Sequence, residues 1–221
     1  MTFQIAIDGP AGAGKSTIAK TIAKQKNYIY VDTGAMYRAV ALYLLRNNVK
    51  ADDTEAVANT CVNADITIRY EDGEQIVLLN GENVNQYLRT EEVGLMASTS
   101  SANPKVREHL LGLQLKLAKE NNVVMDGRDI GTCVLPKAQV KIFLTASSRV
   151  RAERRYKELK AKNVDCDLDE IEQDIIKRDE QDMTREHAPL KQAKDAVLVD
   201  TSDKTIEEVV AEVLKICEQK L

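Results

Sequence analysis

A glycine-rich stretch near the start of the chain, DGPAGAGKST, combines residue types that bind phosphate. The spacing G-x-x-x-x-G-K-[ST] is met by Gly9, Gly14, Lys15 and Ser16, and in this pattern a loop of backbone N–H groups leads into a helix N-terminus. The lysine would reach the outer phosphates, the hydroxyl would complete a Mg²⁺ shell, and the helix dipole adds fixed positive potential. The stretch therefore predicts nucleoside triphosphate binding.

Arginines follow two later apolar runs. Residues 28–31 lead into VDTGAMYR, which contains Arg38, and residues 123–125 lead into MDGRDIGT, which contains Arg128. In open α/β sheets, ligands bind beyond the carboxyl ends of the strands. Because a guanidinium matches phosphate oxygens bidentately, Arg38 and Arg128 are candidates for gripping a second phosphate. A surface salt bridge is the alternative for either residue taken alone.

Two facing anion sites suit phosphoryl transfer, which needs in-line positioning, charge neutralisation and exclusion of water more than covalent chemistry. The sequence has no N-K-x-D motif for guanine and no D-x-x-G after a strand, which argues against a switch GTPase. It also lacks the length and signature of a transporter ATPase. A kinase fits these observations best.

The elements that must position these residues follow an α/β pattern. Short apolar runs suited to buried parallel strands cover residues 3–7, 28–31, 123–125, 140–144 and 196–199. Helical spacing of apolar residues follows Lys15 and recurs over 35–45, 105–118 and 205–217. We therefore expect a three-layer P-loop NTPase fold with a five-stranded parallel sheet between helices.

Two regions depart from that alternation. Residues 65–84 alternate apolar and polar side chains around Asp72-Gly73 and Asn80-Gly81, which predicts two hairpins in a small antiparallel insert. Residues 149–162 carry seven cations and 165–174 carry six acids, a pattern typical of a solvated helical hairpin held by charge pairs. Because this run follows the fourth predicted strand, beyond which ligands gather in open α/β sheets, it is also a candidate part of the site. The expected division of a single domain is a core over about 1–62, 86–148 and 186–221, an insert over 63–85 and a lid over 149–185.

Composition limits the partners. The 221 residues are 43% hydrophobic, carry 31 basic and 35 acidic side chains for a net charge of −4, and are only 4% aromatic. A general nucleic-acid surface is therefore not expected, nor is a membrane segment, and we expect a cytoplasmic protein that works as a monomer. The four scattered cysteines indicate reduced thiols rather than a metal site.

In order along nearly the whole chain, the segments GPAGAGKST, DTGAMYR, PKVRE, DGRDIGT, KIFLTASS, RDEQD and APL resemble the bacterial cytidylate kinases, within the nucleoside monophosphate kinase family. The hairpin insert also matches the bacterial members. The resemblance implies transfer of the ATP γ-phosphoryl group to CMP or dCMP, with Mg²⁺ as cofactor. It does not decide between CMP and dCMP.

The resemblance also assigns site residues. ATP would be held by the loop residues Gly9, Pro10, Ala11, Gly12, Ala13, Gly14, Lys15, Ser16 and Thr17, with Ser16 or Thr17 offering its hydroxyl to Mg²⁺. Asp126, which ends a predicted strand, is a candidate either for steering Mg²⁺ through water or for a simple capping role. The acceptor would contact Thr33 (Ser in several relatives), Tyr37, Arg38, Ser98, Arg107, Arg128, Asp129, Arg178, Asp182 and Arg185. The catalytic cations would be Lys15, Arg128, Arg151 and Arg155, the last two in a lid together with Arg154.

The implied base site makes chemical sense. The N4 amino group of cytosine suits a carboxylate such as Asp129, and its N3 and O2 acceptors suit Arg107, whereas uracil presents a carbonyl in place of the amino group. Two alternatives remain open at this point: a kinase for UMP, AMP or a small alcohol, and a regulator that binds nucleotides without turnover. A panel of acceptors with ATP separates all three.

Overall fold

Five parallel strands form the main sheet in the order β2-β6-β1-β7-β8 in the computed structural model, which describes residues 2–220. The strands are β1 (Gln4–Asp8), β2 (Ile29–Asp32), β6 (Val123–Gly127), β7 (Val140–Thr145) and β8 (Val197–Asp200). Each predicted strand is found, within one or two residues of its expected ends. The five-stranded parallel sheet predicted from the apolar runs is confirmed.

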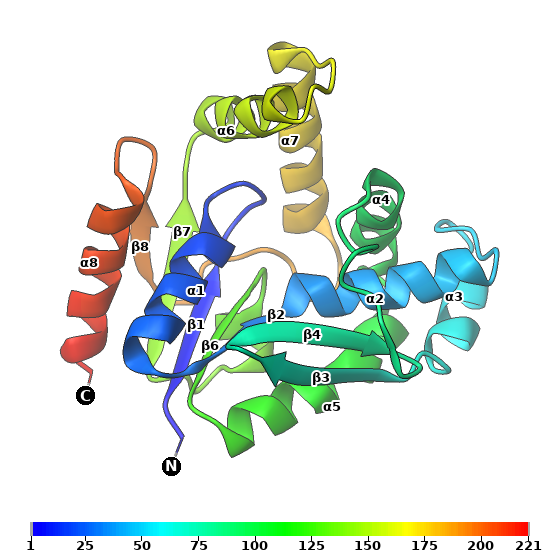
Figure 1. Ribbon diagram of the computed structural model, residues 1–221, viewed down its shortest axis with the longest axis horizontal. Coiled ribbons are helices and arrows are strands. Elements are labelled where there is room, and N and C mark those ends of the chain that lie inside the picture. Colours follow the sequence, from blue (N-terminus) through cyan, green and yellow to red (C-terminus); the bar gives the residue numbers. More distant parts are fainter. Residues whose placement is uncertain (1, 221) are drawn as a thin grey trace.

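Helices cover both faces of this sheet, which gives three layers (Figure 1). Alternating side chains of β1 point to opposite faces: Ile5 and Ile7 pack with α1 (Lys15–Lys26) and α8 (Ile206–Glu218), and Ala6 packs with α2 (Thr33–Arg46) and α5 (Pro104–Glu120). All of these residues in β1 are fully buried. The hydrophobic core is thus split in two by the sheet.

Side-chain caps fix where the main helices begin. The Asp32 carboxylate accepts from the backbone N–H of Ala35 at the start of α2. Asn103 caps α5, whose first residue is Pro104. Since α2 starts directly after β2, Asp32 ends a strand and starts a helix with no loop between them.

The insert is a separate three-stranded antiparallel sheet in the order β3-β4-β5. It comprises β3 (Ile66–Glu71), β4 (Glu74–Leu79) and β5 (Glu82–Asn83). Both turn dipeptides, Asp72-Gly73 and Asn80-Gly81, have positive φ at each residue, as two-residue hairpin turns that match strand twist require. The two predicted hairpins are confirmed. Two short helices that were not predicted flank the insert, α3 (Thr54–Cys61) and α4 (Glu91–Ser100).

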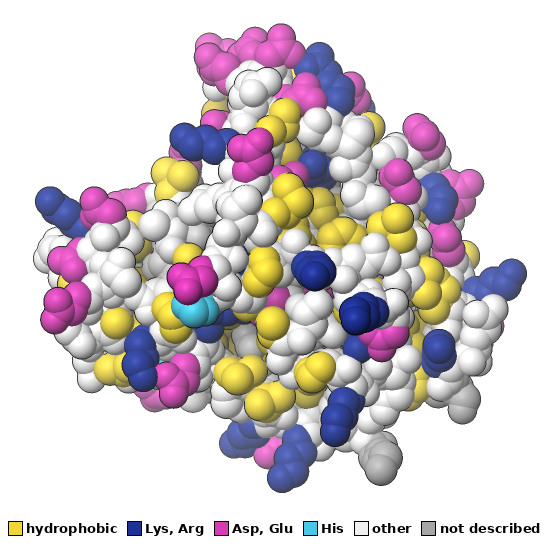
Figure 2. All heavy atoms as spheres, turned by 180° about the vertical axis from the view of Figure 1, so that it is seen from behind, with side chains coloured by type: hydrophobic (Ala, Val, Ile, Leu, Met, Phe, Trp, Pro, Cys, Tyr) yellow, Lys and Arg dark blue, Asp and Glu magenta, His cyan; other side chains and the backbone are white. Residues whose placement is uncertain are grey.

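A helical hairpin follows β7 at the carboxyl edge of the main sheet. Helix α6 (Ser148–Ala161) follows β7 and packs against α7 (Leu168–Thr184), and both project beyond the core (Figure 1). Arg149 joins the two helices through ion pairs with Asp169 and Glu172. Acidic side chains gather at the tip of this projection (Figure 2), where the sequence places its acidic run.

None of the helices within residues 2–220 has the length and apolar character needed to span a bilayer. The four cysteines are free thiols, and Cys61 and Cys217 are buried in the two halves of the core.

Strand register brings the polar strand ends together. Asp8 of β1 lies beside Gly127 of β6 and Phe143 of β7, and Asp32 of β2 lies beside Asp126. A single π-helical turn, η1 (Ile130–Val134), follows β6 at the same edge. Asp8, Asp32, Asp126 and the residues that follow β6 therefore lie together at the carboxyl edge of the sheet.

Candidate active site

The P-loop backbone depends on its glycines. Gly9, Gly12 and Gly14 have φ of 147°, 76° and 87°, which L side chains rarely adopt. A Cβ on Gly9 would lie 2.0 Å from the carbonyl oxygen of Leu144 in β7. Glycine at position 9 therefore lets the loop lie directly against the neighbouring strand, with its backbone free to face a ligand.

Lys15 and Ser16 open α1 and face inward. The Lys15 ammonium is buried and donates to the Pro10 carbonyl at 2.7 Å, and its pKa falls to about 7 because of burial and, next, the charge of Arg128. The Ser16 hydroxyl donates to Asp126 at 2.9 Å, whereas Thr17 is exposed. Of the two hydroxyls that the sequence left open, Ser16 is the one turned toward a carboxylate.

Asp126 of β6 is a buried carboxylate of the site. Burial, and after it the charge of Asp32, raises the pKa of Asp126 to about 6. The Tyr30 hydroxyl donates to its second oxygen at 3.1 Å, and the Thr33 hydroxyl donates to its backbone carbonyl at 2.7 Å. These contacts fix the carboxylate between the P-loop and the end of β2.

The Ser16 hydroxyl and the Asp126 carboxylate fit the chemistry of Mg²⁺. Both are hard oxygen donors, and Mg²⁺ on a nucleotide takes few protein ligands because phosphates and water supply the others. Within residues 2–220 there is no group of three or more His, Cys, Asp or Glu side chains suited to a metal ion. The donor set thus fits an ion that arrives with a nucleotide rather than one caged by protein alone.

Three guanidiniums gather opposite the P-loop. Arg128 donates through Nε to Asp182 at 2.9 Å, and its charge acts on both Arg38 and Arg178. Burial lowers the pKa of Arg38 to about 10, and burial followed by the charge of Arg128 lowers the pKa of Arg178. The buried Nε of Arg178 has no hydrogen-bond acceptor among the described residues. The cluster of Arg38, Arg128 and Arg178, called here the guanidinium cluster, has the charge and open donors that an anion would satisfy.

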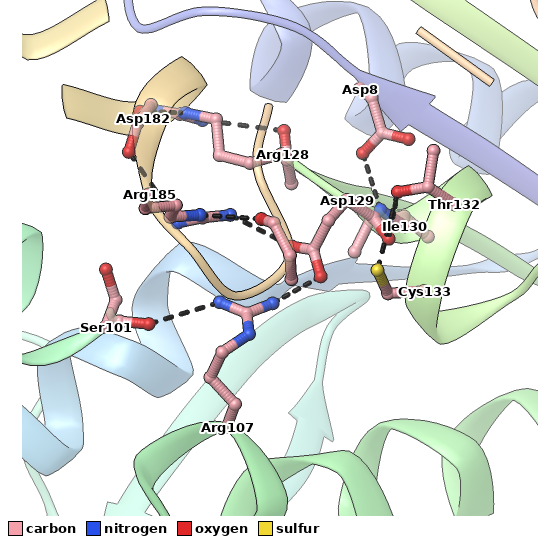
Figure 3. Close-up of polar contacts among 12 residues, drawn as sticks. Asp8, Ser101, Arg107, Arg128, Asp129, Ile130, Thr132, Cys133, Asp182 and Arg185 are labelled. Atoms are coloured by element: carbon pink, nitrogen blue, oxygen red, sulfur yellow. Dashed lines mark hydrogen bonds and ion pairs between the residues drawn. The ribbon is translucent and has the colours of Figure 1, made fainter. Parts of the chain in front are cut away.

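A second group of charges centres on Asp129, which follows Arg128 (Figure 3). Arg107 of α5 donates to one of its carboxylate oxygens and also to the Ser101 carbonyl, at 3.3 Å. Arg185 approaches the other oxygen at 3.6 Å and Asp182 at 3.7 Å, and one buried Arg185 nitrogen, Nη2, makes no hydrogen bond within the described chain. Asp129 is thus held by two arginines from different elements.

A cavity of about 100 Å³ borders this group. It is lined by Tyr37, Arg107, Glu108, Leu111, Gln114, Asp129, Cys133 and Val134. The Arg107 guanidinium lies over the Tyr37 ring at 5.4 Å, and burial raises the pKa of Tyr37 to about 12. The cavity is far below the roughly 300–1,000 Å³ of a pocket for a whole small ligand, so it suits one end of a larger ligand.

The lid arginines differ in what they contact. Arg151 is buried, and its three guanidinium nitrogens bind the Ala146 carbonyl, the Ala11 carbonyl of the P-loop and Asp179 of α7. Arg154 binds Thr201 at the end of β8. Arg155 is half exposed and pairs with Glu158, although its charge is felt by Arg178. Arg151 therefore ties the lid to the P-loop, and Arg155 is the freer cation.

Most of the predicted site residues lie at this one edge of the sheet. Ser98 lies in α4, where its backbone carbonyl accepts from Ser101, the residue whose own carbonyl accepts from Arg107. The base, sugar and phosphate residues named from the resemblance come from α2, α4, α5 and α7 and from the segments that directly follow β6 and α7. Hydrogen bonds and ion pairs join five of them, Arg107, Arg128, Asp129, Asp182 and Arg185 (Figure 3).

Three residues at the site were missed by the sequence analysis. Gln75 of β4 accepts from the backbone N–H of Asp32 at 2.9 Å and donates to its carbonyl at 3.2 Å. Arg89 binds the Asp32 carboxylate at 2.9 Å. Asp8 binds two backbone amides of η1. A polar residue at the end of an apolar strand indicates a site residue, and this pattern could have identified Asp8. Nothing local in the sequence marks Gln75 or Arg89.

The chain is similar in sequence and in fold to known proteins. The sequence profile described as "Cytidylate kinase" matches residues 5–219. The chain is 51% identical to the cytidylate kinase of Caldicellulosiruptor bescii over 97% of this chain and 95% of that protein, and 51% identical to that of Ligilactobacillus salivarius over 99% and 97%. A solved structure of an uncharacterized protein from Eubacterium ventriosum has a TM-score of 0.51 at 12% identity over 98% and 99% of the two chains, which shows similarity of fold alone.

Proposed function

Since the chain belongs to the cytidylate kinase family and phosphorylates CMP or dCMP with ATP, we propose that the P-loop and the guanidinium cluster hold the two nucleotides end to end for direct transfer. The products are ADP and CDP or dCDP. The observation that carries this arrangement is the guanidinium cluster: the buried Nε of Arg178 has no hydrogen-bond acceptor among the described residues, and the charge of Arg128 acts both on Arg178 and on Lys15 of the P-loop.

On the ATP side, the backbone amides of residues 9–17 and the α1 N-terminus bind the β- and γ-phosphates. Lys15 leaves the Pro10 carbonyl and donates to the phosphates, which favour its charged form. Ser16 and Asp126 are the residues that would hold Mg²⁺ on the nucleotide. When bound, the ion neutralises charge that develops on the phosphate oxygens.

On the acceptor side, the guanidinium cluster grips the phosphate of CMP or dCMP. Bidentate contacts from Arg38 and Arg128 fix one acceptor oxygen in line with the γ-phosphorus, and Arg178 adds a third cation. Asp182 holds Arg128 from behind, so that its guanidinium keeps one orientation. Asp182, Arg185 and Thr33 face the sugar, and the extra methyl group of Thr33 lies on that side of the acceptor.

The base lies at the Arg107–Asp129 pair, next to the small cavity and Tyr37. The Asp129 carboxylate accepts from the N4 amino group, and Arg107 donates to N3 or O2, with Ser98 nearby on α4. Uracil would place a carbonyl against the carboxylate, a mismatch of about 1–3 kcal/mol when both are buried.

The lid completes the site. Arg151 of α6 donates a hydrogen bond to the Ala11 carbonyl of the P-loop, so a movement of the lid changes a contact with that loop. Arg155, paired only at the surface, supplies a cation to the transferring phosphoryl group as the lid covers ATP and excludes water. In this account one domain comprises the core, the insert over about 63–85 and the lid over about 149–185, and the lid is the part that moves.

The expected partners are small nucleotides alone. The net charge and the scarcity of aromatic side chains favour neither nucleic acid nor an anionic surface as a partner. The site is assembled from one chain, and we propose a monomer that works in the cytoplasm.

The test of the function is ADP release with ATP and Mg²⁺ in the presence of CMP, dCMP, UMP or AMP, each in turn. We expect the highest kcat/KM with CMP or dCMP. Faster turnover with UMP or AMP would indicate a different acceptor, and no acceleration by any of them would indicate a regulator that binds nucleotides without turnover.

A further inference from the structure

Asp8 is a buried carboxylate that the reaction described above does not use. It is the last residue of β1, it is 4% exposed, and it directly precedes Gly9 of the P-loop. Its two oxygens each accept one backbone hydrogen bond at 2.7 Å: Oδ1 from Ile130 (Figure 3) and Oδ2 from Gly131. A charged acceptor with two short amide contacts makes strong hydrogen bonds.

These two amides belong to the residues that directly follow Arg128 and Asp129. Strand β6 ends at Gly127, so Arg128 and Asp129 lie beyond the strand hydrogen bonds that fix the chain before them. The η1 turn closes on the Asp129 carbonyl through the amides of Cys133 and Val134, which leaves the first two amides of the turn to Asp8. Asp8 therefore fixes the backbone directly after the Arg128–Asp129 pair, although Asp8 and Ile130 are 122 residues apart in the sequence.

Gly131 allows this close approach. A Cβ at position 131 would lie 3.2 Å from Asp8 Oδ2 and 3.2 Å from the Lys141 side chain. Lys141 is itself held by the Pro136 carbonyl and by Asp195. The turn is thus enclosed between a carboxylate and a fixed side chain, and a larger residue at position 131 would have to displace one of them by a few tenths of an ångström.

We propose that Asp8 is a positioning residue that sets Arg128 and Asp129 for the acceptor nucleotide. It joins the two halves of the site, since it is bonded covalently to the P-loop and through hydrogen bonds to the segment that reads the acceptor. This inference rests on the proposed function for the roles of Arg128 and Asp129. It predicts that a substitution of Asp8 weakens acceptor binding and base preference more than it weakens ATP binding.

The test compares Asp8→Asn with the wild type in steady-state kinetics. An asparagine keeps one oxygen for one amide and turns an N–H group toward the other, so the turn must shift. We expect the KM for CMP to rise about tenfold and the preference for CMP over UMP to fall, while the Kd for ATP, measured by calorimetry, changes by less than about twofold.

Two further variants make the test specific. Gly131→Ala crowds the same contact without altering Asp8, and it should shift the KM for CMP in the same direction by a smaller factor. Asp53→Asn is the control, because Asp53 also accepts a backbone amide, that of Ala56, at the exposed start of α3. Its KM for CMP should equal that of the wild type.

A merely structural role would lower the melting temperature and kcat and leave the KM for CMP and the base preference unchanged, and this result overturns the proposal. A rise in the ATP Kd alone also overturns it. If Asp8→Asn does not fold, Gly131→Ala decides by the same criteria. If the wild type fails to phosphorylate CMP, the proposed function is wrong, and calorimetric binding of CMP to the variants still tests Asp8.

Discussion

Removal of the Arg178 guanidinium should stabilise the ligand-free protein against unfolding and lower its affinity for CMP. Arg178→Met keeps a long side chain on α7 and deletes the buried Nε, which has no acceptor in the described chain. It also removes repulsion from Arg128, which together with burial lowers the pKa of Arg178. Asp182 and Asp179 offset part of this cost.

The size of each effect follows from these contacts. A buried unsatisfied donor costs about 1–3 kcal/mol, so after the loss of the two carboxylate interactions we expect the free energy of unfolding to rise by about 1 kcal/mol. For a chain of this length that is a rise of about 2–4 °C in melting temperature. A charge-assisted contact to phosphate is worth about 1.5–3 kcal/mol, so the Kd for CMP should rise roughly tenfold to a hundredfold.

The assay is thermal unfolding with and without saturating CMP, together with a calorimetric titration of CMP. Lys177→Met is the matched control, because Lys177 is the preceding residue of α7 and is exposed. The control should leave both quantities at wild-type values. A lower melting temperature for ligand-free Arg178→Met, combined with an unchanged Kd for CMP, would refute the reasoning and make Arg178 a structural residue.

Three further outcomes are expected. Asp129→Ala should reduce the ratio of kcat/KM for CMP over UMP by about tenfold to a hundredfold, since the acceptor for the N4 amino group is lost; an unchanged ratio contradicts the base assignment. Because burial and then Arg128 lower the pKa of Lys15 to about 7, and bound phosphate favours the charged form, ATP binding at pH 8 should take up about one proton. Calorimetry in buffers of different ionisation enthalpy measures this uptake, and its absence would show that Lys15 is already charged. Gly9→Ala should abolish ATP binding and lower the melting temperature, because the new Cβ would lie 2.0 Å from the Leu144 oxygen; wild-type values in calorimetry and thermal unfolding would count against the close packing of the loop.

The main sheet was predictable because each of its strands is a short apolar run, which is a local feature of the sequence. The insert was predictable because its turns are also marked locally, by Asp72-Gly73 and Asn80-Gly81. Helices α3 and α4 were not predicted. Helix α3 has only eight residues, and α4 contains Gly94 together with several Ser and Thr residues, so neither has a strong helical signal without its tertiary contacts.

The site divides in a similar way. Residues in the P-loop and at strand ends, such as Lys15 and Arg128, are marked by a motif or by their position after an apolar run. The contacts that hold them come from distant residues: Gln75 reaches Asp32 across 43 residues, and Arg89 reaches the same residue across 57. No local pattern encodes such pairs, because they exist only once the insert and the segment that follows it have packed against the end of β2.

The end-to-end arrangement of two nucleotides is tested most directly by a ligand that joins adenosine and cytidine, 5′ to 5′, through a polyphosphate bridge. Calorimetry should give one bound molecule per chain, with higher affinity than ATP or CMP alone, and kinetics should show competition with both substrates. Competition with only one substrate, or two bridged molecules per chain, would contradict the account.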